Sequence, residues 1–206
     1  MSGSCSNSQA ALILIVNMIS KRMNEVLLHS AILADQDWPE YAAYCRARES
    51  GRRRLAFRHL SAFIASIGVA GDGRRRKFAH WVCERLTENE PDSGALLPEP
   101  LLTEIVIPAL GQWRADEPWN SIPLRWLGVL LTSPGHLAVR SGLRPPDEQG
   151  ESLLRKAINL DPPDQVARVR LIECRIGTLD FNAHHLPEAY LGEPETDLKR
   201  VARPSR

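Results

Sequence analysis

Apolar side chains return every three to four positions along most of the chain, and this spacing places them on one face of an α-helix. Residues 52–67 show the pattern clearly, with Leu60, Phe63 and Ile67 on one stripe. The alternation typical of strands is almost absent; the exception is the β-branched triplet at 105–107, where a short strand is the alternative. The spacing predicts helices over residues 24–33, 38–45, 52–67, 74–88, 101–113, 122–132, 151–160 and 165–176.

This pattern predicts an all-α fold of about seven to nine helices packed as helical hairpins, in a compact or slightly superhelical array. Asp37 suits the N-cap of the second helix and Pro39 suits its first turn. Pro108 has no amide hydrogen, so it should kink its helix or divide it in two. The proline-containing stretches 89–100 and 133–150 are typical of loops.

The two ends of the chain differ from the middle. Residues 1–22 lack the amphipathic pattern, which starts with a normal first helix at Met23. The apolar run at 10–19 covers about half of the ~20 residues that cross a bilayer, and its positive charges follow it, unlike those of a secretory signal. We expect 1–22 to be a poorly ordered extension or a mis-assigned start; a buried first helix and a membrane tether are the alternatives. Residues 23–180 are predicted to form one helical domain, and 181–206 a C-terminal extension and tail.

Composition is that of a globular chain with its own core, since 43% of the 206 residues are hydrophobic and 25% are charged. A net charge of +1 argues against bulk binding to nucleic acid. The four cysteines are far apart in the sequence, so no zinc knuckle or Cys-x-x-Cys motif is present, and no secreted disulfide framework is expected. Arginines greatly outnumber lysines, as in GC-rich bacterial genomes, and we expect a bacterial cytoplasmic protein.

Residues 153–172 read LLRKAINLDPPDQVARVRLI. The segment carries a spaced pattern of small, leucine, aspartate and proline residues at Ala157, Leu160, Asp161, Pro162, Asp164 and Ala167. It resembles the junction between successive tetratricopeptide repeats, where Asp-Pro ends one helix and leads into the next. The resemblance implies that Asp161 caps free amides, Pro162 occupies a first turn and Ala167 permits close packing. No second copy follows at the roughly 34-residue period of that family, so the resemblance implies hairpin packing and assigns no ligand-binding residue.

Basic residues are concentrated between positions 46 and 77, where Glu49 and Asp72 are the only acids. They are Arg46, Arg48, Arg52, Arg53, Arg54, Arg58, Arg74, Arg75, Arg76 and Lys77. Two groups stand at the starts of successive helices, where positive charge opposes the helix macrodipole, which indicates a purpose other than stability. Such groups can converge on an acidic protein or on phosphates. The alternative is that the acidic segment 84–118 neutralises them within the chain.

The C-terminal segment contains His184, His185 and Glu188, which are residue types that bind metal. Pro187 argues against one helix carrying all three, and no HExxH arrangement is present. The preferred interpretation is an extension that packs over the helices, with a metal site as the alternative. No GxSxG, P-loop or GxGxxG motif occurs, so no catalytic residue and no cofactor are predicted.

Five tryptophans complete the candidates. Trp119 lies in a turn and is expected to be exposed as a contact residue, whereas the others are expected in the core. The sequence favours a non-enzymatic protein–protein interaction module, such as an immunity, adaptor or chaperone-like protein, with an acidic protein partner and no membrane. The alternatives are a metal-dependent enzyme using the histidines and an arginine-rich nucleic-acid-binding regulator. The predicted protein-binding residues are Arg52, Arg53, Arg54, Arg74, Arg75, Arg76 and Trp119.

Overall fold

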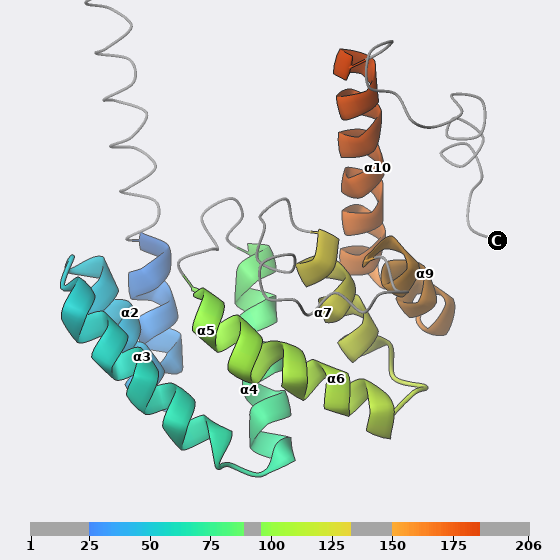
Figure 1. Cartoon of the computed structure of the whole chain (residues 1–206). Coiled ribbons are helices and arrows are strands. Elements are labelled where there is room, and N and C mark those ends of the chain that lie inside the picture. The colour runs from blue at the N-terminus through green and yellow to red at the C-terminus, as the bar shows by residue number, and fades with distance from the viewer. Residues whose placement is uncertain (1–24, 89–95, 133–149, 186–206) are drawn as a thin grey trace, which may run out of the picture. The chain divides into compact units, whose positions relative to one another are not determined.

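The computed structural model describes residues 25–88, 96–132 and 150–185, and every regular element in these ranges is a helix (Figure 1). The all-α prediction is therefore confirmed for this part of the chain. A first helix covers residues 25–34. The elements that follow are α2 (Pro39–Glu49), α3 (Arg53–Gly68), α4 (Asp72–Glu88), α5 (Glu99–Leu101), η2 (Leu102–Val106), α6 (Ile107–Asp116), α7 (Ser121–Thr132), α9 (Gly150–Leu160) and α10 (Gln165–His185).

Several predicted segments fall wholly or largely outside the described residues. They are the extension at 1–22, the loops at 89–100 and 133–150, and residues 186–206 of the C-terminal extension. Residues 181–185 of that extension form the last turns of α10. This helix continues beyond position 176, where the periodic pattern predicted its end, because a single glycine at 177 weakens a helix without stopping it.

The described chain packs as two compact units. The first contains residues 25–88 and 96–117, and the second contains 118–132 and 150–185. The predicted domain at 23–180 spans both of them. We describe each unit by itself.

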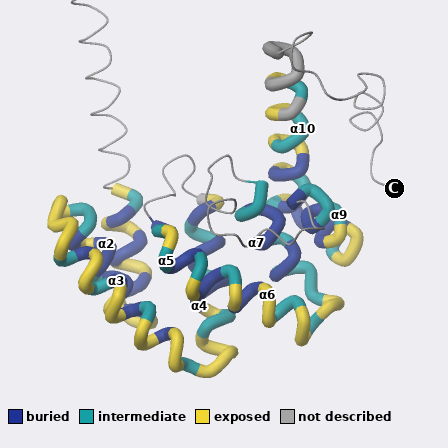
Figure 2. Tube along the Cα trace, in the orientation of Figure 1, coloured by how far each residue is buried: buried dark blue, intermediate teal, exposed yellow. Residues whose placement is uncertain are grey.

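A cluster of aromatic rings forms the centre of the first unit. The ring centroids of Phe63 from α3 and Phe78 from α4 are 4.7 Å apart, and Tyr41 from α2 lies 5.5 and 5.3 Å from them. The Tyr41 hydroxyl donates a buried hydrogen bond of 2.6 Å to the carbonyl of Leu96. Trp38 adds an edge contact to Phe78 at 5.2 Å. This aromatic cluster joins α2, α3 and α4, and the dark blue segments of Figure 2 show the buried positions of each helix facing one another.

The connection between α2 and α3 is a tight turn around Gly51. Its φ of 70° lies in the left-handed region, which glycine adopts without a steric penalty. The turn reverses the chain direction, so α2 and α3 pack side by side as a helical hairpin. The hairpin predicted from the sequence is therefore present here.

The predicted N-cap of α2 is wrong. Trp38 occupies the cap position, and no side chain caps the helix. The Asp37 carboxylate instead accepts a hydrogen bond from Lys77 at 3.2 Å, and the Asp37 carbonyl accepts one from Arg74 at 3.5 Å. The attraction to two cations of α4 outweighs a local cap. Pro39 is in the first turn, as predicted.

The helix around Pro108 contains a π-helical turn. The amide of Ile107 donates to the carbonyl of Leu102, five residues back, and Pro108 stands in the first turn of the regular helix α6. Because Pro108 cannot donate to the residue four positions earlier, the extra residue of a π turn lets the chain pass it without a break. The helix therefore stays continuous past Pro108, so the predicted division into two helices does not occur, and the alternative of a short strand at 105–107 is wrong.

The second unit is held together by close helix packing between α7 and α9. Gly128 of α7 approaches Leu154 so closely that a Cβ atom would lie 2.7 Å from the Leu154 Cγ and 3.1 Å from its amide nitrogen. A side chain at Gly150 would lie 2.6 Å from Thr132. The two glycines therefore allow the helix axes to approach.

α9 and α10 form the hairpin that the sequence predicted at 153–172, with one change. Asp164, not Asp161, caps α10: its carboxylate accepts a hydrogen bond of 3.0 Å from the amide of Ala167. Asp164 stands directly before the helix, where its oxygen reaches an amide three residues ahead, whereas Asp161 precedes two prolines. Ala167 is fully buried, as close packing requires.

Replacing Gly128 by alanine should destabilise the second unit by about 1–3 kcal/mol, because the added methyl group collides with Leu154 in a filled core. Gly111 of α6 has no atom within 4 Å of its virtual Cβ, so Gly111→Ala should raise stability by up to about 1 kcal/mol. Urea denaturation followed by circular dichroism measures both changes. Equal effects of the two substitutions would contradict the close contact.

Candidate functional site

The arginines at the start of α3 form an exposed group. Arg52 is the N-cap residue, Arg53 and Arg54 open the helix, and Arg58 lies one turn further on; all four side chains are exposed. Among the described residues no carboxylate pairs with their guanidinium groups, and the first turn of α3 contains no acidic residue. With the ring of Phe57 they form what we call the α3 arginine patch.

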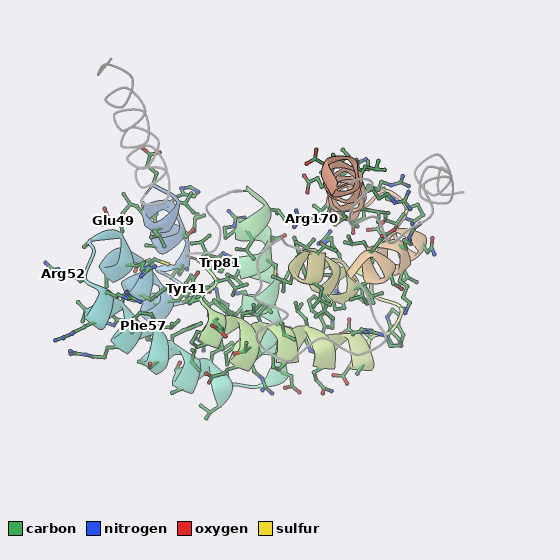
Figure 3. All side chains as sticks on the ribbon, turned by 45° about the horizontal axis from the view of Figure 1, so that its top comes forward. Tyr41, Glu49, Arg52, Phe57, Trp81 and Arg170 are labelled. Atoms are coloured by element: carbon green, nitrogen blue, oxygen red, sulfur yellow. The ribbon has the colours of Figure 1, made fainter. Side chains whose placement is uncertain are left out.

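Phe57 makes this patch amphipathic. Its side chain is 42% exposed, and the guanidinium carbon of Arg53 lies 5.8 Å from the ring centroid. In Figure 3, Arg52 and Phe57 lie on the outer side of the unit, whereas Tyr41 lies in its interior. The sequence analysis missed Phe57, although a signal was present: it falls off the stripe of Leu60, Phe63 and Ile67 that faces the core.

The second basic group, at the start of α4, is bound within the unit. The guanidinium group of Arg76 binds the carboxylates of both Asp116 and Glu117, the latter at 3.1 Å. Glu117 also accepts a hydrogen bond of 2.8 Å from the indole of Trp113. The Arg76 side chain is only 20% exposed. The alternative that the acidic segment neutralises basic residues is therefore correct for Arg76.

Its neighbours have partners as well. Arg75 pairs with Asp72, one turn earlier in α4, and Lys77 pairs with Asp37 at 3.2 Å. The guanidinium carbon of Arg74 lies 5.4 Å from the ring centroid of Trp38. Arg74 and Lys77 fasten α4 to the residues before α2, and Arg75 is paired within α4, so these basic residues are less available to a partner than those of α3.

The two basic groups do not converge. α3 has 16 residues, and at 1.5 Å per residue it is about 24 Å long. One group stands at its first turn, and the other follows its last turn after the connector at 69–71. A single small ligand cannot bridge them.

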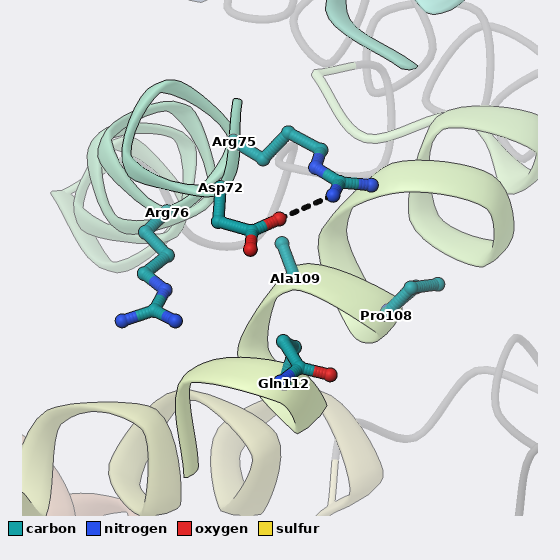
Figure 4. A pocket seen from close by; sticks show the side chains of 6 residues that line it. All are labelled: Asp72, Arg75, Arg76, Pro108, Ala109 and Gln112. Carbon is teal, nitrogen blue, oxygen red and sulfur yellow. Dashed lines mark hydrogen bonds and ion pairs between the residues drawn. The ribbon is translucent and has the colours of Figure 1, made fainter. Parts of the chain in front are cut away.

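A cleft of about 380 Å³ opens beside the second group, lined by Asp72, Arg75, Arg76, Pro108, Ala109 and Gln112 (Figure 4). Its polar groups are largely used within the protein. Arg75 and Arg76 bind the carboxylates named above, and the amide of Gln112 donates to Asp116 at 2.8 Å. With these guanidinium charges already matched, the cleft has no excess positive charge to attract an anion.

The tryptophans largely follow the prediction. Trp119 is 71% exposed, as expected, and belongs to the second unit. Trp38 and Trp126 are fully buried, whereas Trp81 and Trp113 are half-buried.

The thiol and the two phenol groups of α2 are shifted away from their reactive forms. Burial raises the pKa of the Cys45 thiol to about 12, and burial likewise raises the pKa of Tyr44 to about 12. Burial also raises the pKa of Tyr41 well above its usual value. A nucleophile needs the opposite shift, toward the thiolate or phenolate.

The residues of the predicted metal alternative are only partly described. His184 and His185 are the last two residues of α10, and Glu188 lies outside the described residues. Within the described ranges no three His, Cys, Asp or Glu side chains gather as a metal site would require. Nor does any described helix have the length and apolar character that crossing a membrane demands.

Arg76→Ala should lower the free energy of unfolding by about 1–2 kcal/mol, since it leaves two carboxylates and their half-buried surroundings without a cation. Arg54→Ala, at an exposed position without a carboxylate partner, should change it by less than about 0.5 kcal/mol. Thermal and urea denaturation of both variants check this difference. If Arg54→Ala lowered the free energy of unfolding more than Arg76→Ala does, the arginine that stabilises the fold would belong to α3 and not to α4.

Cys45 should resist alkylation in the folded protein. At pH 8 a thiol with a pKa of about 12 is ionised in roughly one molecule in ten thousand. Cys174 is partly exposed and should react with iodoacetamide at least about tenfold faster. Peptide mapping by mass spectrometry gives both rates, and unfolding in urea should make them equal. Equal rates in the folded protein would show that α2 does not bury this thiol.

Comparison of the chain with protein-family models, with curated proteins and with solved structures finds no match.

Proposed function

We propose that this protein is a non-enzymatic interaction module whose α3 arginine patch binds an acidic segment of another protein. The observation that supports the proposal is the contrast between two basic groups of one unit. The group on α4 is used for internal ion pairs, whereas the guanidinium groups of Arg52, Arg53, Arg54 and Arg58 have no carboxylate partner among the described residues.

This arrangement lowers stability, which favours a role in binding. Positive charge at the N-terminus of a helix opposes the macrodipole by about 0.3–1 kcal/mol. Arg54 and Arg58 are four residues apart, where like charges repel each other by about 0.2–0.5 kcal/mol. An acidic partner would turn both penalties into attraction. Arginine beside an aromatic ring is also the composition enriched at protein-binding hot spots.

A protein partner suits the patch better than nucleic acid does. Single-stranded nucleic acid stacks its bases on several rings, and this patch has one, Phe57. The chain as a whole carries a net charge of only +1, too little for the long-range attraction of a phosphate backbone. An acidic segment with an apolar side chain could pair with the arginines and cover Phe57 together. An adaptor, immunity or chaperone-like role would use such a contact.

Arg54→Glu gives a sharp test, because it should strengthen the fold while it weakens binding. A glutamate in the first turn suits the macrodipole and can pair with Arg58, so the free energy of unfolding should rise by about 0.5–1 kcal/mol. Arg74→Glu is the matched control: it makes the same change in charge at the second basic group. Denaturation and partner capture are measured on both variants and on the parent protein.

Capture is best done with a photo-crosslinking residue at Ser61, an exposed position one turn after Phe57. We expect adducts with a protein bearing an acidic segment in the parent and in Arg74→Glu, and a loss of at least about tenfold in Arg54→Glu. The same adducts in all three would show that the α3 arginine patch is not the contact. Adducts with DNA that vanish steeply with salt would favour the nucleic-acid regulator instead.

A further inference from the structure

The helix α10 has two contrasting faces. Ala167, Arg170 and Leu171 are buried and pack toward α7 and α9 of the same unit. On the opposite face Val169, Ile172 and Ile176 are 51%, 56% and 60% exposed. These apolar residues follow one another at intervals of three and four, so they form a continuous stripe.

The stripe has the spacing of a coiled coil. With Val169 at position a of a heptad, Ile172 falls at d, Ile176 at the next a and Leu179 at the next d. The flanking positions are charged in an ordered way. Both g positions are arginine, Arg168 and Arg175, and the e positions after them are acidic, Glu173 and Asp180.

We propose that a second copy of this chain packs against this face, so that two α10 helices form a short parallel coiled coil. The charge pattern selects both the partner and the direction. In a parallel pair each g residue faces the e residue five positions later in the other helix, which brings Arg168 to Glu173 of the second copy. The Glu173 side chain is 45% exposed and pairs with Arg170 at 3.0 Å, so its carboxylate can accept a second cation. Arg175 is 16% exposed and pairs with Glu151 of α9 at 3.4 Å, so it stays within its own unit. An antiparallel pair would bring arginine to arginine and acid to acid. An identical helix in the parallel direction therefore offers Glu173 to Arg168, and Arg168 to Glu173, on the two sides of the stripe.

The shape of the second unit leaves room for the second helix. α10 extends past α7 and α9 (Figure 1), and Figure 2 shows its buried positions confined to the part beside α9. From Ile172 to Asp180 no side chain that the structure describes is buried. Between Ile172 and Asp180 the ion pair of Arg175 with Glu151 ties the helix to α9, while Ile172 and Ile176 on the other face stay exposed. Pairing along the stripe would cover these two side chains.

The oligomeric state tests the proposal. Sedimentation equilibrium of the full chain, from about 1 to about 500 µM, should show a reversible monomer–dimer equilibrium, since an interface of two heptads is small. Ile172→Glu, at the centre of the stripe, should weaken dimerisation at least about tenfold. Val69→Glu places the same charge at another exposed apolar position, 89% exposed at the end of α3, and should leave the dimer unchanged.

Disulfide trapping distinguishes the two directions. In a parallel dimer each a position lies beside the same residue of the other copy, so Val169→Cys and Ile176→Cys should each give a disulfide-linked dimer under mild oxidation. The parent chain, with its own cysteines, provides the background. In an antiparallel dimer the two-fold axis crosses the helix pair at one point, so only a residue beside that point can link to its own copy. A disulfide at no more than one of the two positions would therefore overturn the proposed direction.

Charge exchange adds an independent measurement. Arg168→Glu should weaken self-association, Glu173→Arg should do the same, and an equimolar mixture of the two variants should recover dimers that contain one of each. A chain that stays monomeric throughout the concentration range would refute the second copy. A monomer whose unfolding free energy falls on Ile172→Glu would show that another part of the same chain covers the stripe.

Discussion

The contact among Tyr41, Phe63 and Phe78 determines the form of the first unit. Each ring comes from a different helix. Phe78 meets Phe63 and Tyr41 edge to face at 4.7 and 5.3 Å, and Tyr41 lies tilted against Phe63 at 5.5 Å. Aromatic pairs of this geometry add specific attraction to their apolar burial, so they fix the angles of α2, α3 and α4 together. Once these angles are fixed, the exposed face of α3 and the first turn of α4 point in set directions. The placement of the two basic groups is therefore a consequence of the core.

The ionic contacts then separate structural arginines from available ones. Arg76 lies where α4 meets the end of α6, and two carboxylates surround it. The first turn of α3 lies at the far end of its helix, beyond the reach of those acids. Arginines with the same charge thus have different roles because of where the helices end. The sequence left two alternatives for the whole basic segment: neutralisation by acids of the same chain, or attraction of a partner. The structure shows neutralisation within the chain for the basic group on α4.

Most of the fold could be predicted from the local periodicity of apolar residues. The helices and their buried stripes depend on residues three and four positions apart, so Leu60, Phe63 and Ile67 were readable from the sequence. The details that were not predicted depend on partners far away in the sequence. Asp37 does not cap α2, because its carboxylate accepts a hydrogen bond from Lys77, and Arg76 pairs with Asp116, 40 positions later. The close approach at Gly128 also needs a second helix to be visible. In contrast, the exposure of Phe57 could have been predicted, because it breaks the stripe.

The π-helical turn at Leu102–Val106 has a consequence for how this chain can vary. It holds one residue more than a regular helix needs, and each residue turns a helix by about 100°. Deletion of one residue here would leave the helix intact but rotate α6 about its axis, so Asp116 and Glu117 would no longer face Arg76. The backbone would therefore tolerate a one-residue deletion at this site, but the protein would lose the ion pairs of Arg76 with Asp116 and Glu117. The π turn thus sets the rotation of the helix at which Asp116 and Glu117, more than two turns further along, meet Arg76.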